Sequence, residues 1–178
     1  MASKLRVDHI EPTNGIPTDG GGGIIQVKQA LKTDTSTTTS ATASDISGLS
    51  VSITPHFLSS KLWIVGRVNL GTDFDTCANI HLVANSTEIG KPTSYGSRAA
   101  GHTGRGYRIG NSQYYDSWDC SIDFLYSPSS TSAQTIKVQW SQTDTDGVTM
   151  YCNRSESDND AAWAGRYTST LTVLEVSG

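Results

Sequence analysis

The sequence is poor in charged residues and has no long apolar run. Of its 178 residues only 17% are charged, and the formal net charge is −4. A surface that neutralises nucleic-acid phosphates needs clustered Lys and Arg, so we expect no nucleic-acid partner. No stretch approaches the 18 consecutive apolar residues of a spanning helix, so we expect no membrane insertion.

Cysteine is also scarce, and its three copies form no recognisable pattern. Cys77, Cys120 and Cys152 lie far apart without a Cys-x-x-Cys pair, which excludes a zinc ribbon, a redox dithiol and a disulfide framework. Cys120 and Cys152 fall in phase with the apolar side of their predicted strands. We therefore expect both to be buried thiols in a protein made in a reducing compartment.

Motifs for phosphate binding are missing. Gly20 to Gly23 precede alternating residues that predict a strand, whereas a phosphate cradle opens a helix. We interpret the four glycines as a flexible joint and expect no cofactor.

Motifs for catalysis are missing as well. No Gly-x-Ser-x-Gly elbow occurs, and the only histidines are His9, His56, His81 and His102. We therefore predict no catalytic residues and a protein that is not an enzyme. A glycosidase acting on surface polysaccharide through two of the acidic residues stays a third alternative.

A calcium loop is suggested by spacing alone. Gln142, Asp144, Asp146 and Gly147 match positions one, three, five and six of a helix-loop-helix site, but position twelve is Asn153. The Asp-Gly pair between two alternating segments instead predicts a hairpin. We expect no metal here and interpret Glu156 to Asp160 as a solvated loop, which could still hold a cation in an assembled state.

Serine and threonine make up a quarter of the chain, which suits many short strands with polar outer faces. Segments that alternate with period two predict strands at 24–31, 49–54, 61–70, 80–84, 118–126, 136–140, 148–152 and 170–176. We predict an all-β fold, an antiparallel two-sheet sandwich or jelly roll of about eight strands with an extended N-terminal arm.

The domain organisation follows from the glycine joint. Residues 1–23 contain too few apolar side chains for a core and form an anchoring arm and joint, while 24–178 form the β-sandwich head. The arm lacks the continuous apolar segment of a secretory signal. Its anchoring residues are expected to be Leu5, Val7, Ile10 and Ile16.

The connection between Ile89 and Trp118 is much longer than a hairpin loop and is rich in Gly, Ser, Tyr and Arg. We expect it to face outward and to bind a partner through Arg105, Tyr107, Arg108, Tyr114 and Tyr115, because Arg and aromatic residues dominate interfaces. One further short strand at 107–109 is the alternative interpretation of this loop.

The last predicted strand, TLTVLEV, is apolar on both faces. Leu171 and Val173 lie on one side and Leu174 and Val176 on the other. One face can fill the core, so the second needs another cover. We predict a homotrimer with Leu174 and Val176 at its interface, near the symmetry axis.

The order of segments resembles a type of virion protein of tailed bacteriophages. The resemblance rests on LRVDHIEPTNGIP, GIIQVKQALKTDTSTTTS, GLSVSITPHFLSSKLWIVGRVNL, IHLVANSTEIG, SPSSTSAQTIKVQW, CNRSESDND and STLTVLEVSG. It implies a trimeric jelly-roll head that is fixed by its N-terminal arm. The long loop is the least similar part.

This resemblance implies a non-enzymatic structural protein at the virion surface, assembled in the host cytoplasm among other phage virion proteins of the capsid or tail. It would be a capsid decoration protein or a knob or fibre component. The alternative is a receptor-binding tail-fibre tip that recognises a host surface glycan.

Overall fold

The computed structural model describes residues 23–73, 76–93, 96–105, 115–143 and 147–178. Eleven strands make up its regular structure: β1 (Ile24–Lys32), β2 (Ser36–Thr38), β3 (Ser44–Ile53), β4 (Lys61–Thr72), β5 (Ala78–Ala84), β6 (Thr87–Ile89), β7 (Thr103–Arg105), β8 (Trp118–Tyr126), β9 (Gln134–Gln142), β10 (Met150–Cys152) and β11 (Ser169–Val176). Within the described residues, no helix is long and apolar enough to cross a membrane.

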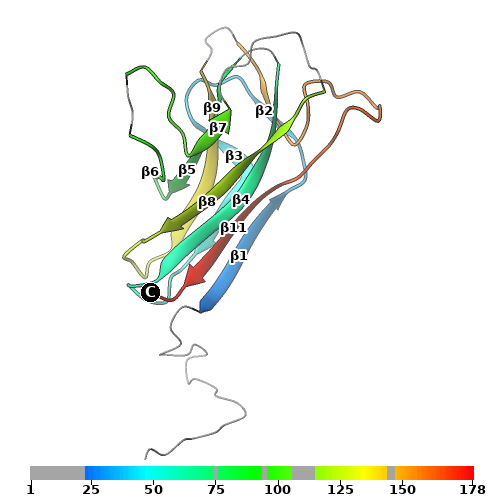
Figure 1. Ribbon diagram of the computed structural model, residues 1–178. Coiled ribbons are helices and arrows are strands. Elements are labelled where there is room, and N and C mark those ends of the chain that lie inside the picture. Colours follow the sequence, from blue (N-terminus) through cyan, green and yellow to red (C-terminus); the bar gives the residue numbers. More distant parts are fainter. Residues whose placement is uncertain (1–22, 74–75, 94–95, 106–114, 144–146) are drawn as a thin grey trace, which may run out of the picture.

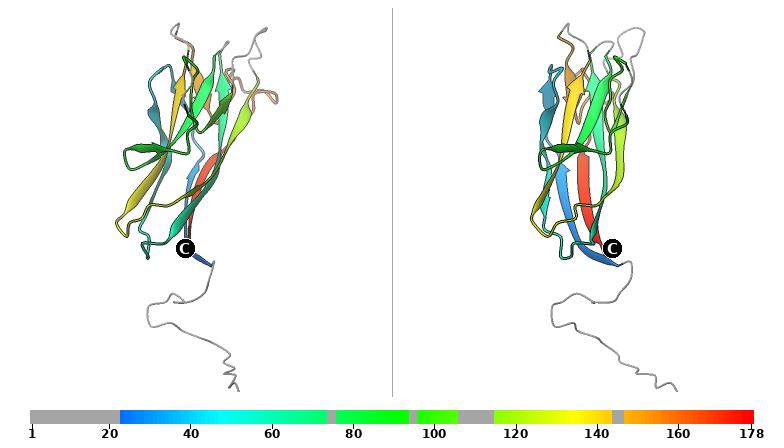
Figure 2. Two further views of the ribbon diagram at one scale, coloured as in Figure 1. Left: turned by 60° about the vertical axis from the view of Figure 1, so that its left-hand side comes forward. Right: turned by 90° about the vertical axis from the view of Figure 1, so that its left-hand side faces the viewer.

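The strands form two antiparallel sheets that face each other as two layers (Figures 1 and 2). The first sheet has the order β1-β11-β4-β10-β2, and β8 pairs with the other side of β4. The second sheet has the order β3-β9-β5-β6, and β7 also pairs with β5. The predicted all-β sandwich is therefore confirmed.

All eight predicted strands are present, and three are additional. β2, β6 and β7 have three residues each, too few to show a period in the sequence. The alternative strand at 107–109 lies outside the described residues. The short strand observed in this connection is β7, which pairs with Ala78, Asn79 and Ile80 of β5.

The core lies between the sheets and follows the predicted inward sets. Leu49, Val51 and Ile53 of β3 are buried, as are the alternate residues of β4, β9 and β11. Cys120 and Cys152 join this core, as predicted. Burial raises the pKa of the Cys120 thiol to about 11 and raises that of Cys152 as well.

Gly66 occupies the middle of β4 because β11 passes close to it. A Cβ atom built there would lie 2.3 Å from the carbonyl oxygen of Thr170. Only glycine leaves room for the two backbones to pair at this point.

The two ends of the sandwich differ. β1 starts where β11 finishes, since Ile24 pairs with Val176, so both lie at one end (Figure 1). The start of β8, β10 and the connection 153–168 lie at the opposite end, which we call the distal end (Figure 1).

Candidate functional site

The structure describes part of the predicted sites. Arg105 and Tyr115 are described, whereas Tyr107, Arg108 and Tyr114 lie outside the described residues. The four arm residues, Leu5, Val7, Ile10 and Ile16, lie outside them too. Leu174 and Val176 are half-buried on the outer face of β11, opposite the buried Leu171 and Val173.

An aromatic pair is exposed on the two distal connections that flank β8 and β11. The rings of Tyr115 and Trp163 meet edge to face with centroids 6.2 Å apart. Their exposed fractions are 45% and 64%, and Tyr167 nearby in sequence is also exposed. Exposed Tyr and Trp provide large, rigid contact areas at low entropic cost. Trp163 joins Tyr115 as a candidate contact residue that the sequence did not reveal.

Arg105 is held by Trp118 and Asp116 rather than projecting freely. Its guanidinium lies 4.1 Å from the ring centroid of Trp118, and one nitrogen lies 3.6 Å from a carboxylate oxygen of Asp116. Lys91, at the start of the same connection, pairs with Glu88 at 3.1 Å. Arg105 and Lys91 therefore each lie beside a carboxylate of this chain.

The connection 153–168 is fixed at its root. Asn153 is fully buried with a positive φ of 63°, and its side-chain amide donates to the carbonyl oxygens of Lys32 and Asp34 at 2.9 Å. Its side-chain oxygen accepts from the hydroxyl of Ser169 at 2.6 Å. Asn153 is thus a structural residue at the position where a calcium loop would need a carboxylate.

The acidic segment 156–160 lies within the same connection, where Arg166 contacts Asp158 at 2.5 Å. Burial and the neighbouring Asp73 raise the pKa of Glu156. Among the described residues, no group of three or more His, Cys, Asp or Glu side chains is arranged to hold a metal ion.

A Ser-His-Glu arrangement occurs on the outer face of the second sheet. His81 Nδ1 lies 2.6 Å from Glu88 Oε1, and His81 Nε2 lies 2.9 Å from Ser141 Oγ. These contacts have the connectivity of a catalytic triad. His81 lies on the outer face of its strand but is only 8% exposed.

Burial argues for a structural role of this arrangement. Ser141 is 6% exposed near the end of β9, where it pairs with Asn79 of β5. An open pocket of about 350 Å³ is lined by His81 and Glu88 but not by Ser141. A catalytic nucleophile must reach its substrate and needs hydrogen-bond donors nearby for the oxyanion. We therefore infer that Glu88 and Ser141 serve as hydrogen-bond partners of the buried His81 side chain.

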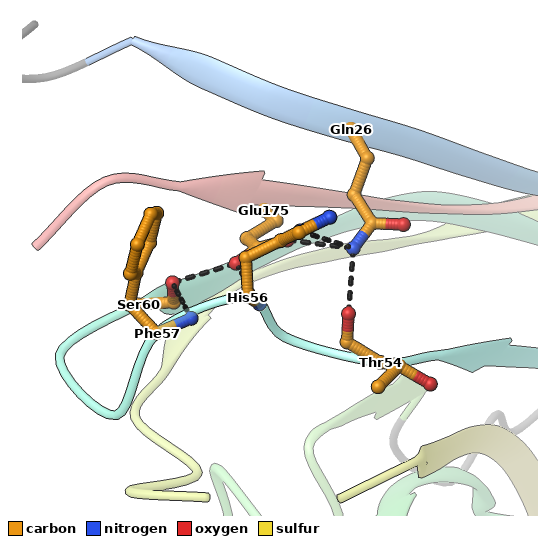
Figure 3. A network of polar contacts seen from close by, with 6 residues as sticks. All are labelled: Gln26, Thr54, His56, Phe57, Ser60 and Glu175. Carbon is orange, nitrogen blue, oxygen red and sulfur yellow. Dashed lines mark hydrogen bonds and ion pairs between the residues drawn. The ribbon is translucent and has the colours of Figure 1, made fainter. Parts of the chain in front are cut away.

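A second polar network lies at the end of the sandwich near the C-terminus (Figure 3). The side chain of Glu175 is fully buried and accepts hydrogen bonds from Gln26 Nε2 at 2.6 Å, His56 N at 2.6 Å and Ser60 Oγ at 2.6 Å. His56 Nδ1 lies 2.8 Å from its second oxygen. Glu175 therefore ties β1 and the β3–β4 connection to β11 (Figure 3).

Comparisons with known proteins identify no family. No family model matches the chain, and no curated protein matches it. Among solved structures, the chain is similar to a chain in the structure of infectious bursal disease virus Gt strain, with 12% sequence identity and a TM-score of 0.37. It is also similar to a chain in the structure of the Gx strain, with 10% identity and a TM-score of 0.38.

A third similar structure is the D431N mutant VP2 protein of that virus from derived T=1 particles, with 10% identity and a TM-score of 0.36. Each match covers 85% of this chain. The chain spans only 38 to 40% of the length of those chains. Likenesses of this size assign no function to the chain.

Proposed function

We propose that the chain is a non-enzymatic structural protein on the virion surface of a tailed phage. In this proposal residues 1–23 anchor the protein to the capsid or tail, and residues 24–178 form a head displayed as a homotrimer. It would be a capsid decoration protein or a knob or fibre component. The basis is the sequence resemblance together with an all-β head whose two ends differ.

The observation that carries the proposal is the opposed position of the arm and the aromatic pair. The 22 residues before Gly23 enter the sandwich at Ile24, next to Val176. Tyr115 and Trp163 are exposed in the connections that precede β8 and β11. The start of β8 and the connection 153–168 lie at the distal end (Figure 1). An anchored head would therefore present its aromatic contact residues away from the particle.

Deletion of residues 1–19 tests the anchor. We expect a folded head with unchanged circular dichroism that no longer incorporates into particles, because the arm cannot fold without a partner surface. Imaging the labelled full chain on intact virions would locate it on capsid or tail. Undiminished incorporation of the deleted chain would reject the anchor.

The exposed aromatic pair favours a second candidate, a receptor-binding tip that recognises a host surface glycan. Rigid aromatic side chains at a protruding end are suited to stacking on sugar rings. Replacing Trp163 by Ala should then reduce adsorption of virions to host cells without changing incorporation. Unchanged adsorption would favour the decoration role, and new reducing ends after incubation with host polysaccharide would instead indicate an enzyme.

A further inference from the structure

The outer face of the first sheet carries apolar side chains in register across four strands. Val27 of β1 pairs with Leu174 of β11, Leu174 pairs with Trp63 of β4, and Trp63 pairs with Leu125 of β8. Residues paired in this way point to the same side of a sheet. In the next row Ile24 lies beside Val176, and the apolar pattern ends at Lys61 of β4, which pairs with Val176 on its other side. We call the six apolar residues the apolar face.

The apolar face is exposed in the isolated chain. The exposed fractions are 53% for Val27, 41% for Trp63, 51% for Leu125 and 56% for Ile24. Neighbouring strands are about 4.8 Å apart, so a row across four strands is roughly 14 Å wide. One row of four large apolar side chains, extended by Ile24 and Val176, makes a patch of roughly a few hundred Å², the size at which exposed patches usually mark interaction sites.

Polar groups border this face, as they border the core of a protein interface. Trp63 Nε1 donates to Asp123 Oδ1 at 2.8 Å, which fixes the indole relative to β8. Arg67 and Asp119 form a partly exposed ion pair at 3.3 Å further along the same strands. A fixed aromatic residue at the centre of such a face is the usual form of an energetically important contact.

We propose that the apolar face binds two further copies of this chain in a homotrimer. The inference rests on the trimeric head of the proposed function and extends it from Leu174 and Val176 to Trp63, Val27, Leu125 and Ile24. Trp63 is assigned as the central contact residue.

The two halves of the apolar face favour a ring of copies over a symmetric pair. The β1 half is aliphatic at Ile24 and Val27, whereas the β8 half combines Leu125 with the carboxylates of Asp119 and Asp123. Unlike halves pair head to tail, and a head-to-tail contact between identical chains closes into a ring when the rotation between copies divides a full turn. In such a ring each copy uses one half for each neighbour.

The position of the arm supports a copy of the chain as the occupant. The 22 residues that precede the first described residue, Gly23, are followed by Ile24, which is itself part of the apolar face. Packing copies through this face brings their arms together at one end. Three linked arms would hold a particle far more tightly than one, because each later contact is intramolecular.

Oligomeric state in solution tests the inference. By light scattering, we expect the full chain to have the mass of about three 19.0 kDa chains. Leu174→Asp should reduce the mass to that of one chain, because it places charge in a dry contact. Ser52→Asp, on the exposed outer face of the second sheet, is the matched control and should leave the trimer intact.

Leu125→Lys is a second variant that tests the same face in case the Leu174→Asp chain misfolds. Leu125 is half exposed, so a lysine there is compatible with the fold but not with a buried contact. Circular dichroism should match the unmodified chain, and the mass should again be that of one chain. A monomeric full chain, or trimers of both variants, would overturn the inference.

The arm is the competing occupant, and deletion of residues 1–22 separates the two. The deleted chain should stay trimeric. Its dissociation, with both face variants still trimeric, would show that the arm makes the contacts and would overturn the inference. A monomeric chain that still incorporates into virions would reject the apolar-face trimer and the trimeric head, but not the anchored role on the virion. A trimer found on no particle would reject the proposed function alone.

Discussion

The outer faces of the two sheets differ although both sheets share one core. A row across the first sheet reads Val27, Leu174, Trp63 and Leu125, whereas a row across the second reads Ser50, Lys137, Val83 and Glu88. The difference shows that period-two alternation identifies the side of a strand that faces the core. The residues on the other side indicate whether that side faces solvent or another protein surface.

The inner faces of the two sheets differ the other way round, because the charged side chains lie on the first sheet. The first sheet buries two ionisable side chains, Lys32 and Glu175, at the ends of β1 and β11. A central inner row of the second sheet reads Val51, Ile136 and Ala84, all buried. The first sheet is therefore apolar where it faces outward and locally charged where it faces inward.

The largest expected effect on this comparison comes from Glu175→Leu. The substitution would leave the buried hydroxyl of Ser60 and the part-buried donors of Gln26 and His56 without their acceptor, which costs about 1–3 kcal/mol of unfolding free energy. Urea denaturation measures the loss. Glu175→Gln keeps one acceptor oxygen and should lose less, whereas a loss below about 1 kcal/mol for the leucine variant would mean that the network is not stabilising.

Acid should weaken the same network. Burial raises the pKa of Glu175, but the hydrogen bonds from Ser60, Gln26 and His56 outweigh it, so the pKa lies below the ordinary 4.5. A depressed pKa contributes stability that is present above the unfolded value and is lost as the pH falls through the folded value. The unfolding free energy should therefore decrease as the pH drops below about 4.5. Glu175→Gln should show a shallower decline, and identical slopes would contradict this assignment.

A smaller effect is expected on the outer face of the second sheet. Lys137 contacts Asp45 at 2.8 Å, but the Asp45 side chain is 54% exposed. The hydrogen bonds from Lys137 and Gln139 lower the pKa of Asp45. Solvent screens such a pair, so Lys137→Ala should cost at most about 1 kcal/mol in the same urea experiment. A larger loss would show that this face is structurally as demanding as the inner face of the first sheet.

The smallest perturbation is a thiol reagent, which reports burial without a substitution. Cys120 and Cys152 of the first sheet are buried with raised pKa values, whereas Cys77, just before β5, is partly exposed. One thiol should react quickly in the native protein and three after unfolding, because the thiolate is the reactive form. Rapid reaction of a second thiol under native conditions would show that the first sheet opens.

The sequence predicted the long strands because each repeats its alternation several times. That pattern predicts which side of β4, β8 and β9 faces the core, but their partners and register come from the structure. It could not predict β6, whose three residues acquire a role only by covering His81 through Glu88. Glu175 lies in phase with Leu171 and Val173, yet its partners Ser60 and His56 are 115 and 119 positions away.

The candidate contact residues were predictable only in part. Arg105 and Tyr115 stood out because they belong to one long, Arg- and Tyr-containing connection. Trp163 lies in a different connection with little local pattern, and only the fold brings its ring to Tyr115. Likewise, Leu174 and Val176 were visible in the sequence, but Trp63 joined them only through the pairing of β4 with β11.

The pairing of β1 with β11 also sets the order in which the chain can fold. Gln26 and Glu175 are 149 positions apart, so β1 emerges from the ribosome long before its only ladder partner among the described strands. Closing so long a loop costs entropy before any contact forms, which makes such pairings slow. Until residues 169–176 have been synthesised, the strand that follows the arm is an unpaired edge, and a nascent chain would be open to pairing with its neighbours on the same message.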